Sequence, residues 1–298
     1  MRKPRITRRE MMFNSARAAA GLSLACLAGS CQSESIMHRP CYKGFKIGAC
    51  DWALGKSSDP GSFAVARKIG LDGVQVNTGG VKNNMHLRKP HIQKQFLDAA
   101  GENGMEIASL CLLDLNGVPY KSDPRAEEWA ADSIDVARAM NVPIVMLPFF
   151  GKADLRNDKE GADVVVKRLC RIAPKAEKAG VVVGIESWLS AREHMEIINR
   201  VGSRNVKVYY DVGNSHKAGY DIYGEIRSLG ADNLCEFHAK DYKYLFGKGK
   251  VDFPEVRRAM DDAGYRGWIQ IEGAKPLGLE ESYTQNARYL RTIFPRKV

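Results

Sequence analysis

The chain has 298 residues, of which 44% are hydrophobic and 27% are charged, and this composition indicates a globular protein rather than a disordered or fibrous one. The net charge is +10, but the first 30 residues contribute half of it, and the remaining charge is too dispersed to indicate a nucleic-acid-binding surface. At this length we expect one large domain with a sizeable core and no transmembrane span in the mature chain.

Residues 1–30 have the features of an export signal. Arg8 and Arg9 precede a modest apolar stretch, Ala18–Ala28, that is too short to span a bilayer. The paired arginines resemble a twin-arginine signal, and the segment ending at Cys31 resembles an imperfect lipobox whose cysteine is lipidated after cleavage. We therefore expect an exported protein, periplasmic or anchored through Cys31 to the periplasmic side of a bacterial membrane. The alternative is an ordinary basic, amphipathic N-terminus.

After a polar linker over residues 31–43, residues 44–298 alternate short apolar runs with segments of helical periodicity. Strands are predicted at Lys46–Cys50, Gly73–Asn77, Glu106–Leu110, Pro143–Leu147, Val181–Glu186, Val206–Asp211, Leu234–His238 and Trp268–Glu272. Helices are predicted at Ser62–Ile69, Lys89–Asn103, Arg125–Met140, Ala162–Ala179, Ala191–Val201, Ile222–Leu229, Phe253–Ala263 and Leu279–Ile293. Eight such units favour a single α/β domain, a closed (β/α)8 TIM barrel, over an open doubly wound sheet. Three of the helices are followed by a glycine that can take the left-handed conformation, Gly104, Gly180 and Gly264.

Beyond residue 31, the chain has five widely spaced cysteines and no Cys-x-x-Cys pair. Four of them lie in apolar runs, which predicts small core residues rather than metal ligands or disulfide partners: Cys50, Cys111, Cys170 and Cys235. We assign them no functional role.

The last four predicted strands each finish with a side chain that can bind a metal ion: Glu186, Asp211, His238 and Glu272. In a barrel of this kind, catalytic groups lie where the strands run into the following loops, so the four side chains are expected to converge. Three carboxylates buried together repel one another and lose hydration, which a divalent cation would offset. The donor set suits one Mn²⁺, Co²⁺, Mg²⁺ or Zn²⁺ ion.

The segments around these residues resemble the xylose isomerase-like TIM-barrel superfamily, in particular its sugar phosphate isomerase/epimerase branch. The most specific segments are Tyr209–Asn214, Glu236–Asp241, Gly249–Phe253 and Gly267–Glu272. In the ketose 3-epimerases of this family, the carboxylates that end strands five and eight bind one metal ion and move protons on opposite faces of the sugar. The resemblance implies that Glu186 and Glu272 are the acid/base pair and that Asp211 and His238 complete the metal shell.

One metal ion and two carboxylates leave several reactions open. Deprotonation of a ketose or keto-sugar gives an enediolate. Return of the proton to the opposite face gives an epimer, and its return to the adjacent carbon gives an isomer. If a leaving group lies β to the carbanion, it is expelled instead, and the enzyme is a dehydratase or lyase. Asn214 stands where the better-known ketose epimerases have a histidine. Export favours a free sugar, a keto-sugar or an oxidised glycoside over a phosphorylated metabolite.

Lys240 lies two residues after His238 and is expected to point to the same side, where it would bind a substrate oxygen or stabilise the enediolate. The alternative is a loop lysine paired with Asp241 or with solvent. Glu236 is expected deeper on the inner face, where it would orient a ligand or pair with a cation. Further substrate contacts are expected from polar and aromatic residues after the strands, with packing or capping as the alternative: Asp51, Trp52, Gln75, Asn77, Trp188, Asn214 and His216.

Two functions of other classes remain as rivals. Endonucleases of the same superfamily use three zinc ions, but six histidines, several of them outside the strand ends, are too few for such a cluster. A non-catalytic, sugar-binding lipoprotein would keep the polar and aromatic cavity mouth without four converging ligands. We expect a small-molecule sugar as the partner and no nucleic acid, and the sequence leaves a homo-oligomer open.

Overall fold

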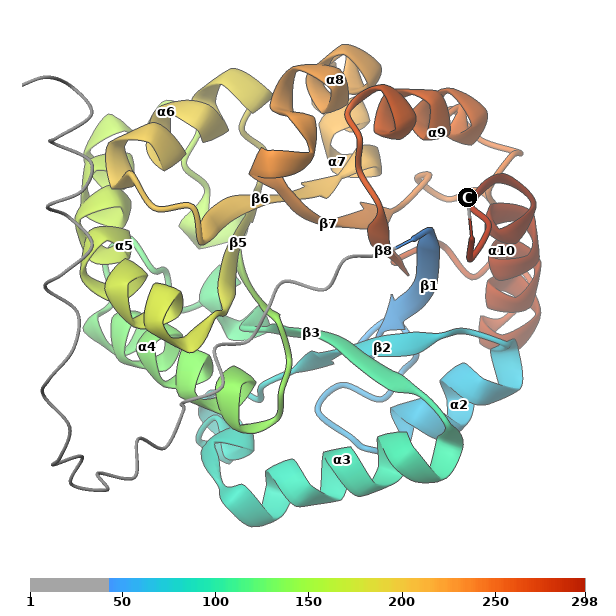
Figure 1. The fold of residues 1–298 in the computed structure, drawn as a ribbon, viewed down its shortest axis with the longest axis horizontal. Helices are drawn as coiled ribbons and strands as arrows, with labels where there is room; N and C mark the ends of the chain where they lie inside the picture. Colours follow the sequence, from blue (N-terminus) through green and yellow to red (C-terminus); the bar gives the residue numbers. More distant parts are fainter. Residues whose placement is uncertain (1–42, 298) are drawn as a thin grey trace, which may run out of the picture. The chain divides into compact units, whose positions relative to one another are not determined.

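Eight parallel strands pair in chain order, β1 to β8, and β8 pairs with β1 to close a barrel (Figure 1). The computed structural model describes residues 43–297. The strands are β1 (Phe45–Cys50), β2 (Gly73–Asn77), β3 (Glu106–Cys111), β4 (Ile144–Phe149), β5 (Val182–Ser187), β6 (Val206–Asp211), β7 (Leu234–Ala239) and β8 (Gly267–Ile271). This arrangement confirms the predicted single-domain (β/α)8 barrel.

The helices lie outside the strands and cover the barrel wall (Figure 1). They are α2 (Ser62–Ile69), α3 (Pro90–Asn103), α4 (Pro124–Ala139), α5 (Lys159–Ala179), α6 (Ala191–Val201), α7 (Val212–Lys217), α8 (Ile222–Asn233), α9 (Phe253–Asp262) and α10 (Leu279–Ile293). Four 3-10 turns lie in the loops: Val81–Asn83, His86–Arg88, Leu113–Asn116 and Gly151–Ala153. Among the described residues, no helix combines the length and the apolar character needed to cross a membrane.

Local sequence explains where these helices begin and end. Side-chain oxygens of Asp123, Asp158, Ser190 and Asp252 accept backbone N–H groups in the first turns of α4, α5, α6 and α9. At the other end, Gly104, Gly180 and Gly264 have φ angles of 62°, 69° and 74°. Such angles strain residues that carry a Cβ, so the three glycines stop α3, α5 and α9 as predicted.

The structure differs from the sequence-based prediction in one short helix and at one cysteine. Helix α7 was not predicted; it forms because Asp211, the last residue of β6, caps the N–H groups that follow it. Cys170 was expected in the core, but it is exposed, because it lies on the outer side of α5, while Cys50 and Cys111 are buried as expected. The predicted export signal, Cys31 and Cys41 lie outside the described residues.

The first and last units of the barrel are joined through Asp72, which precedes β2. Its carboxylate accepts the backbone N–H of Ile47 on β1 at 2.7 Å and forms ion pairs with Arg291 on α10 and with Arg296. The backbone N–H of Phe45 also donates to the carbonyl of Pro295. These contacts fix the seam of the barrel at the end opposite the carboxyl termini of the strands.

Candidate metal centre

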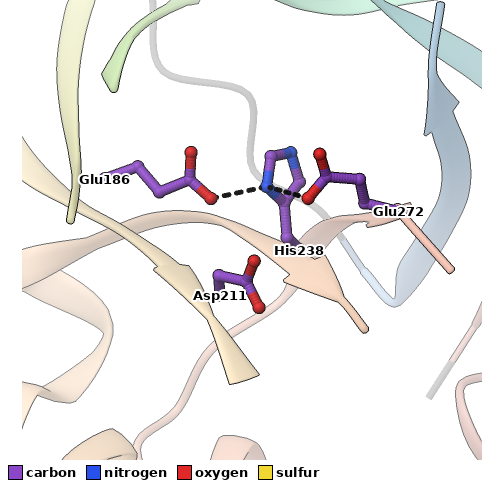
Figure 2. Close-up of side chains that lie close together, drawn as sticks. All are labelled: Glu186, Asp211, His238 and Glu272. Atoms are coloured by element: carbon purple, nitrogen blue, oxygen red, sulfur yellow. Dashed lines mark hydrogen bonds and ion pairs between the residues drawn. The ribbon is translucent and has the colours of Figure 1, made fainter. Parts of the chain in front are cut away.

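Four side chains converge at the carboxyl ends of the last four strands. Glu186 comes from β5, Asp211 from β6 and His238 from β7, and Glu272 directly follows β8 (Figure 2). One ligand atom from each lies within 4.8 Å of the others. Glu186, Asp211 and His238 are buried, and Glu272 is partly exposed toward the cavity. The structure therefore brings together the four residues that the strand ends predicted.

Backbone geometry holds Asp211 in place. Its Oδ1 accepts the N–H groups of Gly213 and Asn214 at 2.8 and 2.9 Å, which leaves Oδ2 directed toward Lys240. A Cβ on Gly213 would lie 2.6 Å from the carbonyl oxygen of Lys240. Glycine is thus required where the start of α7 passes the end of β7.

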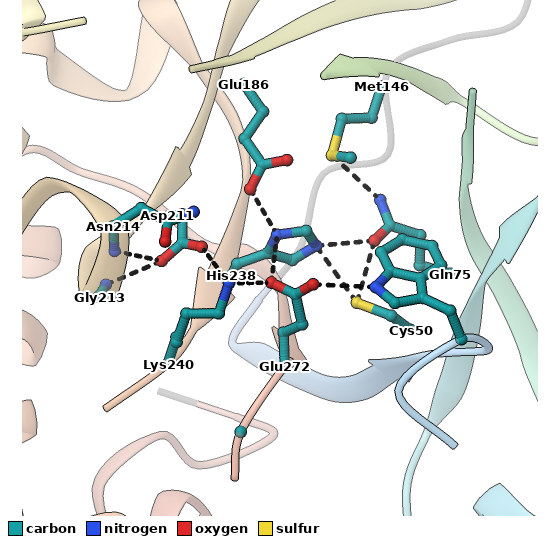
Figure 3. Close-up of polar contacts among 12 residues, drawn as sticks. Cys50, Gln75, Met146, Glu186, Asp211, Gly213, Asn214, His238, Lys240 and Glu272 are labelled. Atoms are coloured by element: carbon teal, nitrogen blue, oxygen red, sulfur yellow. Dashed lines mark hydrogen bonds and ion pairs between the residues drawn. The ribbon is translucent and has the colours of Figure 1, made fainter. Parts of the chain in front are cut away.

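Glu272 is held from two sides. The indole N–H of Trp52 donates to its Oε1 at 2.9 Å. Lys240 Nζ lies 2.5 Å from its Oε2 (Figure 3). Lys240 Nζ also lies 3.3 Å from Asp211 Oδ2, so the ammonium group bridges two of the carboxylates. This confirms the expected direction of Lys240 and excludes its pairing with Asp241, whose Oδ1 accepts backbone N–H groups instead.

The two ring nitrogens of His238 face different surroundings. Nδ1 lies 2.7 Å from Glu186 Oε1, whereas Nε2 lies 2.7 Å from the amide oxygen of Gln75 (Figure 3). An amide oxygen only accepts, so Nε2 carries a proton and donates it to Gln75. The lone pair of the neutral ring is then on Nδ1, directed into the carboxylate cluster.

The charged groups of the cluster shift one another's pKa values. Burial acts to lower the pKa of His238, but Glu186, Glu272 and Asp211 outweigh it and raise this pKa to about 9. Burial raises the pKa of Glu186. Burial also acts to raise the pKa of Glu272, but the neighbouring Lys240 and His238 reverse the effect and lower it. Before a cation binds, protons on His238 and Lys240 thus balance most of the carboxylate charge.

The residues fit a divalent metal ion. One oxygen of Asp211 is fixed by backbone N–H groups and one oxygen of Glu272 by Trp52, so their second oxygens point into the cluster. Together with Glu186 and the Nδ1 of His238, these are hard oxygen and imidazole donors of the kind that Mn²⁺, Co²⁺, Mg²⁺ and Zn²⁺ accept. Binding of the ion would displace the Nδ1 proton of His238.

A cavity of about 190 Å³ opens above the cluster. Both glutamates line it, together with four of the predicted contact residues, Trp52, Trp188, Asn214 and Lys240. Five more lining residues come from the ends of β3 and β4 and the loops after them: Leu113, Asn116, Met146, Pro148 and Phe150. None of these five residues was predicted, because most of this wall is apolar and it contributes no ionisable group.

Three expected substrate contacts make structural contacts instead and do not line the cavity. Asp51 is buried, and its Oδ2 accepts the N–H groups of Ser58 and Asn77. The amide of Asn77 donates to Ser57, and His216 Nδ1 lies 2.8 Å from the hydroxyl of Tyr242. Asp51 and Asn77 fix the loops after β1 and β2, because short polar side chains readily bond to nearby groups. His216 lies in α7 and joins this helix to the loop after β7.

Two inner residues also differ from expectation. Gln75, expected to touch substrate, lies beneath the cavity as the acceptor for His238. Glu236 is fully buried, as its two-residue spacing from His238 predicted, and its Oε1 accepts the amide N–H of Gln270 rather than a hydrogen bond from one of the four cluster residues. Both lie one layer deeper in the barrel, where inward-pointing residues of neighbouring strands meet.

Residues 63–293 match the family model described as xylose isomerase-like TIM barrel. The 2-epi-5-epi-valiolone 7-phosphate 2-epimerase of an Actinoplanes strain is 25% identical over 200 residues, which cover 66% of this chain and 72% of that enzyme. The D-psicose 3-epimerase of Enterocloster bolteae is 25% identical over 202 residues, covering 63% and 65% of the two chains.

Among solved structures, the D-psicose 3-epimerase of Clostridium cellulolyticum H10, crystallised with D-tagatose, superimposes with a TM-score of 0.70. The alignment covers 83% of this chain and 99% of that one at 16% identity. At this identity the superposition supports the barrel architecture alone.

Proposed function

The chain belongs to the xylose isomerase-like TIM-barrel family, and on that premise we propose that it is a divalent-metal-dependent epimerase of a ketose or keto-sugar. The observation that carries the proposal is the convergence of two glutamates, an aspartate and a histidine at the barrel mouth, with donor atoms within 4.8 Å of one another. Two relatives at 25% identity are a 2-epi-5-epi-valiolone 7-phosphate 2-epimerase and a D-psicose 3-epimerase, which supports an enzyme of this class.

Glu186, Asp211, His238 and Glu272 would hold the ion. When bound, the ion would supply a Lewis acid that polarises the substrate carbonyl and acidifies the adjacent C–H bond. The site keeps room for such a substrate, since Glu186 and Glu272 both line the cavity above the cluster.

In the proposal, the two glutamates act on opposite faces of a substrate. They come from β5 and from the end of β8, and they lie on opposite sides of the His238 ring (Figure 2). Lys240 keeps Glu272 ionised, so its carboxylate can remove the proton next to the carbonyl. In the proposed reaction, Glu186 returns a proton to the other face and so inverts the carbon.

Lys240 has a second role in the proposal. Its ammonium group lies beside Glu272 and lines the same cavity, so it can donate a hydrogen bond to the oxygen on which negative charge develops after deprotonation. Trp52 and Trp188 offer indole rings to the sugar, and Asn214 offers an amide. The export signal expected at residues 1–30 would make the substrate an extracytoplasmic sugar.

Solvent exchange tests the proposal. The metal-loaded protein is incubated with a panel of ketoses and keto-sugars in D2O, and nuclear magnetic resonance follows the carbon-bound hydrogens. We expect an epimer that carries one deuterium at the inverted carbon. Glu186→Gln and Glu272→Gln should each slow its formation by about 100-fold or more, whereas the exposed Glu102→Gln should not.

Two outcomes would contradict the proposal. Expulsion of water or an aglycone from the same substrates, with no epimer, would identify a dehydratase or lyase. Binding of sugars by metal-loaded protein without any exchange would identify a sugar-binding protein.

A further inference from the structure

A second cavity, of about 550 Å³, lies beside the catalytic one. Its lining residues are Gly213, Asn214, Lys217, Lys240, Tyr242, Lys243, Tyr244 and Lys250. Four of these eight residues are lysines, and none is acidic. Asn214 and Lys240 line both cavities, so a molecule bound over the glutamates can extend past them into this lysine cavity.

Three of the lysines have no counter-charge within the part of the chain that the structure describes. Lys217, Lys243 and Lys250 make no ion pair there, whereas Lys94 and Lys175 elsewhere on the surface pair with carboxylates. Lys250 Nζ instead lies 5.4 Å from the ring centroid of Tyr242, and Lys243 Nζ lies 5.8 Å from that of Tyr244. Ammonium groups around one cavity repel one another, and an anion bound in the cavity would offset this repulsion.

The loop that carries two of these lysines is fixed at its base. Asp241 Oδ1 accepts the backbone N–H groups of Lys250 and Val251, which closes residues 241–251 into a loop. A Cβ on Gly249 would lie 2.2 Å from Asp241 Oδ2, so only glycine allows this close approach. Because the two ends of the loop are bonded to each other, the backbone positions of its lysines are fixed.

The middle and the start of the loop are fixed as well. The backbone N–H of Phe246 donates to Asn286 on α10 at 2.9 Å, and the Phe246 ring packs against Phe253 with centroids 4.7 Å apart. The hydroxyl of Tyr242 lies 2.8 Å from His216 Nδ1, which joins the loop to α7 and so to Lys217.

We propose that the lysine cavity binds a negatively charged substituent of the substrate, a carboxylate or a phosphate group, while the sugar carbon reacts over Glu186 and Glu272. Ammonium groups form charge-assisted hydrogen bonds with both kinds of oxyanion. The inference rests on the proposed function and narrows its substrate class to anionic keto-sugars. A carboxylate would suit an oxidised extracytoplasmic sugar, and a phosphate would suit a phosphorylated one.

Binding measurements without turnover test this inference separately from the reaction. Isothermal titration of the metal-loaded protein compares three ketoses that differ at the last carbon: D-fructose, D-fructuronate and D-fructose 6-phosphate. Inorganic phosphate tests the lysine cavity by itself. We expect at least one charged ketose to bind about tenfold or more tightly than D-fructose, and raising the salt to about 0.5 M should weaken this preference.

The Lys243→Gln/Lys250→Gln double variant should reduce the preference to less than about threefold. The matched control is Lys167→Gln/Lys178→Gln, which removes the same charge from exposed positions on α5 and should change nothing. Tighter binding of fructuronate would identify a carboxylate subsite, and tighter binding of the phosphate ester and of inorganic phosphate would identify a phosphate subsite.

Equal affinity for the three ketoses, a preference that survives the double variant, or no binding of any anion would overturn the inference. None of these results bears on epimerisation of a neutral sugar. Conversely, a protein that binds anions through Lys243 and Lys250 but catalyses no deuterium exchange would retain the subsite and lose the proposed reaction.

Discussion

Gln75 shows how a single buried acceptor can decide which nitrogen of a histidine faces the candidate metal centre. Its amide oxygen accepts the Nε2–H of His238, and the Cys50 thiol donates to the same oxygen at 3.3 Å. On the other side, the amide nitrogen of Gln75 donates to Met146 Sδ at 3.5 Å. Gln75 is fully buried and touches no substrate cavity, so its role is to position His238.

We predict that Gln75→Leu weakens metal binding by about 10- to 100-fold, because the Nε2–H loses its acceptor and the ring loses its fixed tautomer. Titration of the metal-free protein with Co²⁺ measures this affinity directly. Met146→Leu is the control: it removes a contact of Gln75 but none of His238, and it should change the affinity by less than about threefold. An unchanged affinity in Gln75→Leu would show that the carboxylates alone orient the ring.

His194 should make stability depend on pH. It is buried at the start of α6, where Nδ1 donates to the carbonyl of Ser190 at 3.0 Å and Nε2 accepts the Ser187 hydroxyl at 2.9 Å. Burial lowers the pKa of His194 to about 4, whereas the unfolded chain has a pKa near the ordinary value of about 6.5. The unfolded chain therefore binds the proton more readily, and this contribution to stability is lost as the pH falls from about 6.5 toward 4.

Urea denaturation at pH 7.5 and pH 5 should show a loss of about 2 kcal/mol from His194. In His194→Gln the loss between the two pH values should shrink by about that amount, whereas substitution of the exposed His91 by glutamine should leave it unchanged. Equal losses of stability in the wild type and in His194→Gln would contradict the assignment.

Residue types at strand ends were enough to predict the ionisable part of the site. Glu186, Asp211, His238 and Glu272 end apolar strands, and parallel strands of a barrel bring their carboxyl ends together. The supporting partners were not predictable in the same way. Gln75 and Asp51 are polar residues in or just after a strand, as the residues that line the cavity are. Only the depth of each side chain in the barrel shows that Gln75 accepts a hydrogen bond from His238 and that Asp51 holds a loop.

At the scale of elements, the loop over residues 241–251 and helix α3 each contain a glycine whose substitution by alanine tests whether glycine is required there. Gly249→Ala places a Cβ 2.2 Å from Asp241 Oδ2 and should destabilise the protein by about 1–3 kcal/mol. Gly101→Ala, within α3, meets nothing within 4 Å and should stabilise by about 0.5–1 kcal/mol. Urea denaturation of the two variants checks the signs, and equal effects would contradict the role of Gly249 in closing the loop.

Periodicity located every strand and the eight long helices, because alternating apolar runs and helical repeats extend over many residues. It did not reveal α7, which has six residues and depends on a single cap, Asp211. Cys170 was predicted to be buried because its sequence neighbours are apolar, but it is exposed. An apolar stretch of a long helix such as α5 also contains residues that face solvent. Short elements and helix faces depend on tertiary packing that a local window does not contain.

At the scale of the whole molecule, barrel closure creates the candidate site. The four metal-competent residues span positions 186 to 272, and no two are close in sequence, yet the closed strand order β5 to β8 places them around one point. Closure also adds the loop after β1, whose Trp52 contacts Glu272 after β8. The export signal and the lipidation of Cys31 stay predictions, since they concern residues outside the described part of the chain.

Metal content tests the central claim most directly. Elemental analysis of the purified protein, after reloading with Mn²⁺, Co²⁺, Mg²⁺ or Zn²⁺ and removal of excess ion, should find about one divalent ion per chain. Glu186→Ala, Asp211→Ala, His238→Ala and Glu272→Ala should each lose most of it, whereas the exposed Asp232→Ala should keep it. A wild-type protein that retains none of the four metals, or four variants that all retain the ion, would contradict the account.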